Sequence, residues 1–220
     1  MTRKDYIYTS LCTLFSILIV VSNLIYQKFV SLHVLPFQTF ELSVGAILYP
    51  LTFLITDLIA EFYGKKEANF CVRLAISINI IVACVVAGMD RFEPTSWSKI
   101  DKNTFHQVFG FYSVAFIGST IACYIAQFID IIVYLNIRRI TKGKWLWLRN
   151  NGSTCISLFV DTFIVIICMS LFKLIPFNRV WSLIIDSYLF KLFFSFSSTP
   201  IFYLFVAIMR KVWKEEKLSC

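Results

Sequence analysis

Charged residues are scarce in this chain of 220 residues, and the groups on which most metal proteins depend are scarcer still. Asp, Glu, Lys and Arg make up 15% of it, against about 25% in a soluble globular domain. There are two histidines, His33 and His106, and no CxxC, no HExxH and no P-loop. These absences exclude a haem or zinc-protease centre, a CxxC zinc or redox pair and ATP hydrolysis of the P-loop type. We therefore expect no cofactor and no metal site.

Long hydrophobic runs take up most of the chain instead. Hydrophobic residues make up 58% of it, and the mean hydropathy is +0.74. A helix needs about 20 apolar residues to cross the core of a bilayer. Six segments qualify: residues 7–26, 44–62, 70–89, 110–135, 153–174 and 181–209. Because they leave no room for a soluble domain, we expect a single all-α integral membrane domain over residues 1–220, a bundle of six transmembrane helices.

The net charge of +8 follows from an uneven distribution of basic residues. Apart from Lys191, 14 Lys and Arg fall on the side of the two termini and six on the opposite side. Cytoplasmic segments carry the excess of Lys and Arg, so we expect both termini in the cytoplasm. The basic charge then serves topology and contact with membrane lipids, and no nucleic-acid partner is expected.

Five of the 13 acidic residues lie inside the predicted spans. They are Asp57, Glu61, Asp130, Asp161 and Asp186. An Asp at the centre of such a helix costs roughly 2.5–3.5 kcal/mol, so these groups face a bundle interior or a wet cavity. Lys191 is the one basic residue expected deep within a span, because Arg73 and Lys173 lie near span ends and Arg149 falls in the connection before the fifth span. At most one acid can then have a deeply buried basic partner.

The second span carries the densest pattern of polar residues. Asp57 and Glu61 are four residues apart, so both carboxylates project from one helical face. Their like charges repel each other unless a proton or a cation comes between them. Pro50 should kink this helix and free backbone carbonyls near its middle. In an alternative interpretation, Glu61 reaches the cytoplasmic interface beside Lys65.

Three further spans add polar side chains. Gln127 and Asp130 share a face of the fourth span, Asp161 lies eight residues into the fifth, and Asn23 lies toward the outer end of the first. A structural bundle rarely needs so many polar groups. The pattern predicts a pathway for a small molecule or an ion.

The second span, YPLTFLITDLIAEFYGK at residues 49–65, closely resembles the motif of the queuosine-precursor transporters, also called the vitamin uptake transporter family. Other matching segments are Ser22 with Asn23, YIAQFID at 124–130, and LRNNGST at 148–154 followed by Asp161 and Thr162. The resemblance implies a multi-pass carrier of the bacterial inner membrane, not an enzyme. Its implied substrate is a purine-like small molecule, a 7-deazaguanine base or queuine, imported for tRNA modification.

The chemistry of such a ligand suits these residues. A deazaguanine presents an amidine-like N–H edge that a carboxylate can accept in bidentate fashion. We expect recognition by Asp57, Gln127, Asp130 and Asp161, with the amide of Asn23 completing the edge. Glu61 is a candidate proton site or gate.

Two other functions compete with a carrier. The family resembles the substrate-binding subunits of energy-coupling-factor importers, which leaves a subunit of an ATP-driven vitamin importer as the alternative. Those subunits dock their partner through alanine motifs on the first helix, and residues 10–21 contain no alanine, which favours a carrier without an obligatory ATPase partner. An intramembrane aspartyl protease is the lesser alternative, since no acid within a span lies in a Gly-x-Gly-Asp motif. A cation channel or a structural subunit would show no saturable uptake.

Overall fold

The computed structural model describes residues 3–35, 38–110, 112–173 and 175–218, and six of its helices are long and apolar enough to cross a membrane. Five of them correspond to α1 (Arg3–Ile25), α3 (Lys65–Met89), α5 (Tyr112–Ile140), α6 (Leu146–Leu171) and α7 (Val180–Leu218), and the sixth runs from Val44 to Phe62 and contains α2 (Tyr49–Phe62). The prediction of six helices that can span a membrane is confirmed, and the described chain is mostly helical. The predicted end of the fifth span, residue 174, lies outside the described residues.

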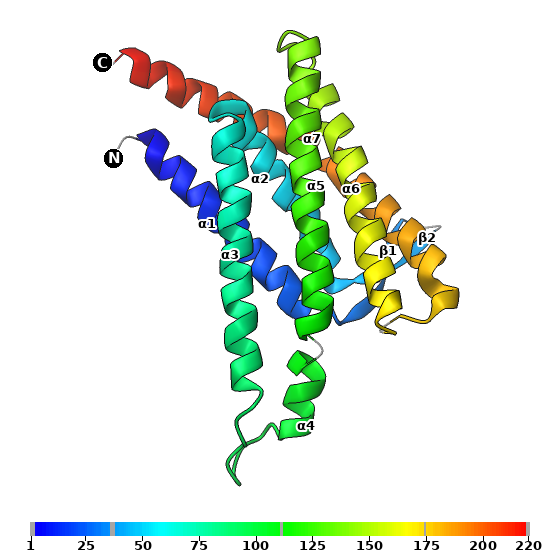
Figure 1. Cartoon of the computed structure of the whole chain (residues 1–220). Coiled ribbons are helices and arrows are strands. Elements are labelled where there is room, and N and C mark those ends of the chain that lie inside the picture. Colours follow the sequence, from blue (N-terminus) through cyan, green and yellow to red (C-terminus); the bar gives the residue numbers. More distant parts are fainter. Residues whose placement is uncertain (1–2, 36–37, 111, 174, 219–220) are drawn as a thin grey trace.

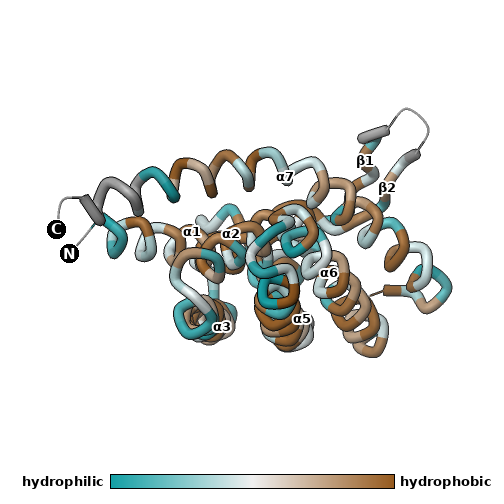
Figure 2. Tube along the Cα trace, turned by 90° about the horizontal axis from the view of Figure 1, so that it is seen from above, coloured by the Kyte–Doolittle hydropathy of each residue, from teal (hydrophilic) through white to brown (hydrophobic). Residues whose placement is uncertain are grey.

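The spanning helices pack around α2. Seen from above, α3, α5 and α6 lie in one row, α7 runs along the opposite side, and α2 lies between (Figure 2). About 67% of the second span is buried, against 28–44% in each of the others, and α2 contacts all five. Large apolar side chains on the outer helices, such as Ile81 and Leu204, are exposed, as expected of a surface that faces lipid. Polar groups on α2 are therefore held away from lipid.

The start of the second span differs from the prediction. Pro50 does not kink the middle of a helix, because it is the second residue of α2, where its missing N–H removes no helical hydrogen bond. The 3-10 turn η1 (Val44–Ile47) precedes it. Gly45 in this turn lies against α1, and an added Cβ would collide with the carbonyl oxygen of Ser22. The glycine thus lets the end of α1 approach the start of α2.

The two ends of the bundle are built differently (Figure 1). At one, here called the terminal end, α1 begins, α7 ends, and short turns join α2 to α3 and α5 to α6. The other, here called the hairpin end, carries an antiparallel pair of strands that the hydropathy pattern did not predict. The elements at this end are β1 (Phe29–Leu35), β2 (Gln38–Ser43), α4 (Lys102–Phe105), η2 (His106–Gly110) and η3 (Phe177–Arg179). Phe40 and Leu42 of β2 pack on Phe190, which fixes the hairpin against α7.

Candidate functional site

Buried polar side chains follow one face of α2 through the bundle, from the hairpin end to the terminal end. Apart from one adjacent pair, Thr56 and Asp57, they are three or four residues apart, which places them on that face, opposite polar residues of α5 and α6. From the hairpin end the α2 residues are Tyr49, Thr52, Thr56, Asp57 and Glu61. We call this series, with its partners, the polar column.

A small cavity of about 50 Å³ lies at the hairpin end of the polar column. Of the predicted site residues, Asn23 and Asp161 line it, together with Ser22. Among the described residues that line it, four buried atoms have no hydrogen-bond partner: Ser22 Oγ, Asn23 Nδ2, Tyr26 Oη and Asp161 Oδ1. Such a group costs about 1–3 kcal/mol when it stays unpaired. These four atoms are therefore the groups that a ligand in the cavity can satisfy.

The partners of Asp161 and Asn23 fix which atoms stay free. Lys191 Nζ donates to Asp161 Oδ2 at 2.8 Å and to Thr162 Oγ1 at 3.0 Å. Ser119 Oγ donates to Asn23 Oδ1 at 2.6 Å, so the NH₂ of the amide is the free group. The cavity thus has an acceptor from α6 and a donor from α1. Lys191 was expected to be a deep partner for one acid, and that acid is Asp161.

Gln127 lies deeper in the column, away from the cavity lining. Its Nε2 donates to Thr52 Oγ1 at 3.1 Å, and its Oε1 accepts from Thr56 Oγ1 at 2.9 Å. The amide therefore joins α5 to two successive turns of α2. Because both ends of the amide are occupied, Gln127 is not free to bind a ligand without a rearrangement.

Asp57 and Asp130 come next along the column. Their carboxyl groups lie close enough to interact with each other. Ser157 Oγ donates to Asp130 Oδ1 at 2.8 Å, whereas both oxygens of Asp57 and Oδ2 of Asp130 lack a hydrogen-bond partner in the described structure. Asp57 is 1% exposed and Asp130 0%. The predicted recognition residues are therefore divided among three separate places: the cavity, the Gln127 bridge and this acid pair.

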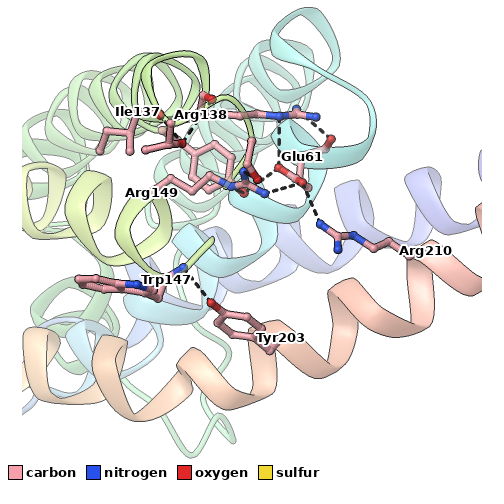
Figure 3. A network of polar contacts seen from close by, with 10 residues as sticks. Glu61, Ile137, Arg138, Trp147, Arg149, Tyr203 and Arg210 are labelled. Carbon is pink, nitrogen blue, oxygen red and sulfur yellow. Dashed lines mark hydrogen bonds and ion pairs between the residues drawn. The ribbon is translucent and has the colours of Figure 1, made fainter. Parts of the chain in front are cut away.

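Glu61 closes the terminal end of the column (Figure 3). Its Oε1 lies 2.6 Å from Arg149 Nη2 and 3.8 Å from Arg210 Nη2, and its Oε2 lies 3.6 Å from Arg138 Nε. Tyr134 Oη donates to Oε2 at 3.1 Å. The Glu61 side chain is only 7% exposed. One carboxylate thus ties α2 to α5, α6 and α7, and its partners are arginines rather than Lys65.

Arg149 does not lie where the sequence predicted it, in the connection before the fifth span. It is not in a loop, because α6 begins at Leu146, and its side chain is 1% exposed. It also donates to Tyr134 Oη at 3.3 Å and to the carbonyl oxygen of Gly143 at 3.0 Å. Lys191 is therefore not the only deep basic residue. The sequence signal that could have identified Arg149 is its position in the LRNNGST segment at 148–154, which resembles the family.

Asp186, the fifth acid within a span, lies partly buried on α7 and does not line the cavity at the hairpin end. It therefore has no part in the polar column. This position offers a matched control for substitutions of the other four acids.

Comparison with known proteins gives consistent matches. Residues 43–205 match the family described as "Putative vitamin uptake transporter". The "Probable queuosine precursor transporter" of Bacillus subtilis (strain 168) is 35% identical over 162 residues, which cover 73% of this chain and 70% of that protein. A protein of the same name from Haemophilus influenzae is 25% identical over 126 residues, 57% of this chain and 51% of its own length. No solved structure is significantly similar.

Proposed function

Because the chain belongs to the vitamin uptake transporter family, we propose that it imports a queuosine precursor, a 7-deazaguanine base or queuine, across the bacterial inner membrane. The names of the two relatives support the substrate class. The observation that carries the proposal is the cavity at the hairpin end, where unpaired polar atoms of Ser22, Asn23 and Asp161 line one space. We take this cavity as the substrate site.

The free atoms of the cavity complement the pyrimidine edge of a deazaguanine. That edge carries N–H donors next to a carbonyl acceptor. Asp161 Oδ1 can accept from an N–H group, while Asn23 Nδ2 and the Ser22 hydroxyl can donate to the carbonyl oxygen. Tyr26 and Tyr49 also line the cavity and offer rings against which a flat base can pack.

The terminal end of the polar column, at Glu61, is closed and serves as the gate of the carrier. Three arginines on three helices hold the Glu61 carboxylate there, so separating the helices at this end requires breaking these pairs. We call these ion pairs of Glu61, together with the hydrogen bond that Tyr134 donates to it, the lock. A carrier with its cavity at one end and such a lock at the other is arranged for alternating access. Substrate would enter from the hairpin end and leave, once the Glu61 pairs open, at the terminal end.

A rescue experiment tests the proposed function. In cells that lack both queuosine synthesis and their own importer, this chain alone should restore queuosine in tRNA when queuine or a precursor base is supplied at low concentration. Labelled uptake should saturate and be competed by the unlabelled base. Absence of rescue by any supplied base would contradict the proposal, and rescue only with a co-expressed ATPase module would make the chain a subunit of an ATP-driven importer.

The proposed direction of import requires both termini in the cytoplasm. The basis is the excess of Lys and Arg at the terminal end. A fluorescent protein fused after residue 220 should therefore be active, whereas alkaline phosphatase fused there should not. Phosphatase inserted in the connection between α3 and α4, at residue 96, should be active instead. The reverse pattern would show that both termini lie outside the cytoplasm and would contradict the proposed topology.

A further inference from the structure

The carboxyl pair of Asp57 and Asp130 has no role in the substrate cavity. Neither residue lines that cavity, and the Thr52, Thr56 and Gln127 hydrogen bonds lie between them and it along α2. The two groups lie on different helices, and three of their four oxygens have no partner in the described structure. Two buried carboxylates this close, without a donor between them, repel each other strongly.

The charged groups around the pair do not neutralise it. Arg149 of α6 is a buried cation whose charge acts on Asp57, but its Nη2 is bound to Glu61 at 2.6 Å. Tyr134 of α5 donates to the same Glu61. On α7, Lys191 is held by Asp161 and Arg210 reaches Glu61. Cys12 of α1 and Cys71 of α3 contribute their thiols to the surrounding core.

We propose that Asp57 and Asp130 form a binding site for one proton, and that its occupancy couples substrate movement to the proton gradient. One proton converts one carboxylate into an acid whose O–H donates to the other carboxylate. That single step removes the repulsion and satisfies two of the three unpaired oxygens. The inference rests on the proposed function, since a coupling site needs a carrier.

A proton fits this place better than a metal ion. Na⁺ or Mg²⁺ binds through five or six oxygen ligands, while the pair offers three free carboxylate oxygens, with the Ser157 hydroxyl already donating to Asp130. The charge of the Arg149 guanidinium, which acts on Asp57, would repel a second fixed cation. No group of three or more acid, Cys or His side chains that could hold a metal ion was found among the described residues.

The location of the pair explains how a proton could control the gate. Asp57 lies one helical turn before Glu61 on α2, and Asp130 lies one turn before Tyr134 on α5. Both Glu61 and Tyr134 belong to the lock at the terminal end. When the pair is protonated, α2 and α5 can stay together. When it loses the proton, repulsion acts on the same two helices that the lock joins.

The test uses the full chain in proteoliposomes, with labelled queuine or 7-aminomethyl-7-deazaguanine outside and the membrane potential clamped at zero. For one proton per substrate, a gradient of one pH unit, acid outside, should raise steady-state accumulation about tenfold. Asp57→Asn and Asp130→Asn should each abolish this accumulation. Exchange of internal unlabelled base for external labelled base should stay within about threefold of the unaltered chain, because an amide beside the remaining carboxylate donates the hydrogen bond that the proton otherwise provides.

Asp186→Asn is the matched control, the same substitution within a span but outside the polar column, and should keep the tenfold accumulation. Size-exclusion profiles show whether each variant is folded. Tenfold accumulation in both Asn variants, or accumulation driven by a sodium gradient instead, would overturn the proton site. Equilibration without accumulation by the unaltered chain would overturn the coupling and leave the carrier standing. No movement of either base would overturn the proposed function itself.

Discussion

Asp161→Asn is expected to reduce the uptake of labelled queuine by roughly 10- to 100-fold, because the carboxylate provides the acceptor for the N–H edge and charged hydrogen bonds contribute about 1.5–3 kcal/mol each. The substitution has a second effect. It leaves Lys191, which is 4% exposed, without its carboxylate. Removing one partner of a buried ion pair destabilises a protein by about 3–5 kcal/mol. Loss of uptake by this variant alone would therefore not separate recognition from stability.

The double variant Asp161→Asn with Lys191→Met separates the loss of substrate recognition from the loss of stability. It has no unpaired charge, so its thermal stability in detergent should recover to near that of the unaltered chain. Uptake should stay lost, because the acceptor in the cavity is still missing. Uptake restored together with stability would mean that the pair is structural and that the base binds elsewhere.

Much of the fold follows from hydropathy alone, and the deviations have physical causes. The predicted spans stop short at the terminal end, where α3 begins at Lys65 instead of residue 70 and α5 ends at Ile140 instead of residue 135. Apolar windows end at the first charges, but helices continue through charges that have partners or reach solvent. The hairpin of residues 29–43 was missed because its alternation is short and its packing partner, Phe190, is distant in sequence.

The candidate site could be predicted only as a set of residues on one side of the bundle. Sequence spacing gives the face of a helix, so all six predicted residues were expected to share an interior. Their division into a cavity, an amide bridge, an acid pair and an ion-pair lock depends on helix depth and on partners such as Ser119, Ser157 and Arg149. None of these contacts is local in the sequence.

Arg149→Met is expected to abolish uptake and to lower the free energy of unfolding by about 3–5 kcal/mol, because it leaves the buried carboxylate of Glu61 without its shortest ion pair. The other two arginines give a graded comparison. Arg138 and Arg210 are 39% and 62% exposed and lie 3.6 and 3.8 Å from Glu61. Exposed pairs contribute about 0–1 kcal/mol, so Arg138→Gln and Arg210→Gln should each have small effects on stability.

The double variant Glu61→Gln with Arg149→Met tests whether this pair is a gate or only a support. Without either charge, the protein should regain its stability, as in other buried pairs replaced together. If the pair holds the terminal end closed, the ends of α2 and α6 in the double variant should exchange amide hydrogens faster, and net uptake should stay at least about tenfold below normal. Glu67→Gln, at the same end but outside the network, is the control and should match the unaltered chain. Normal uptake by the double variant would show that the pair of Glu61 and Arg149 only supports the fold and does not act as a gate.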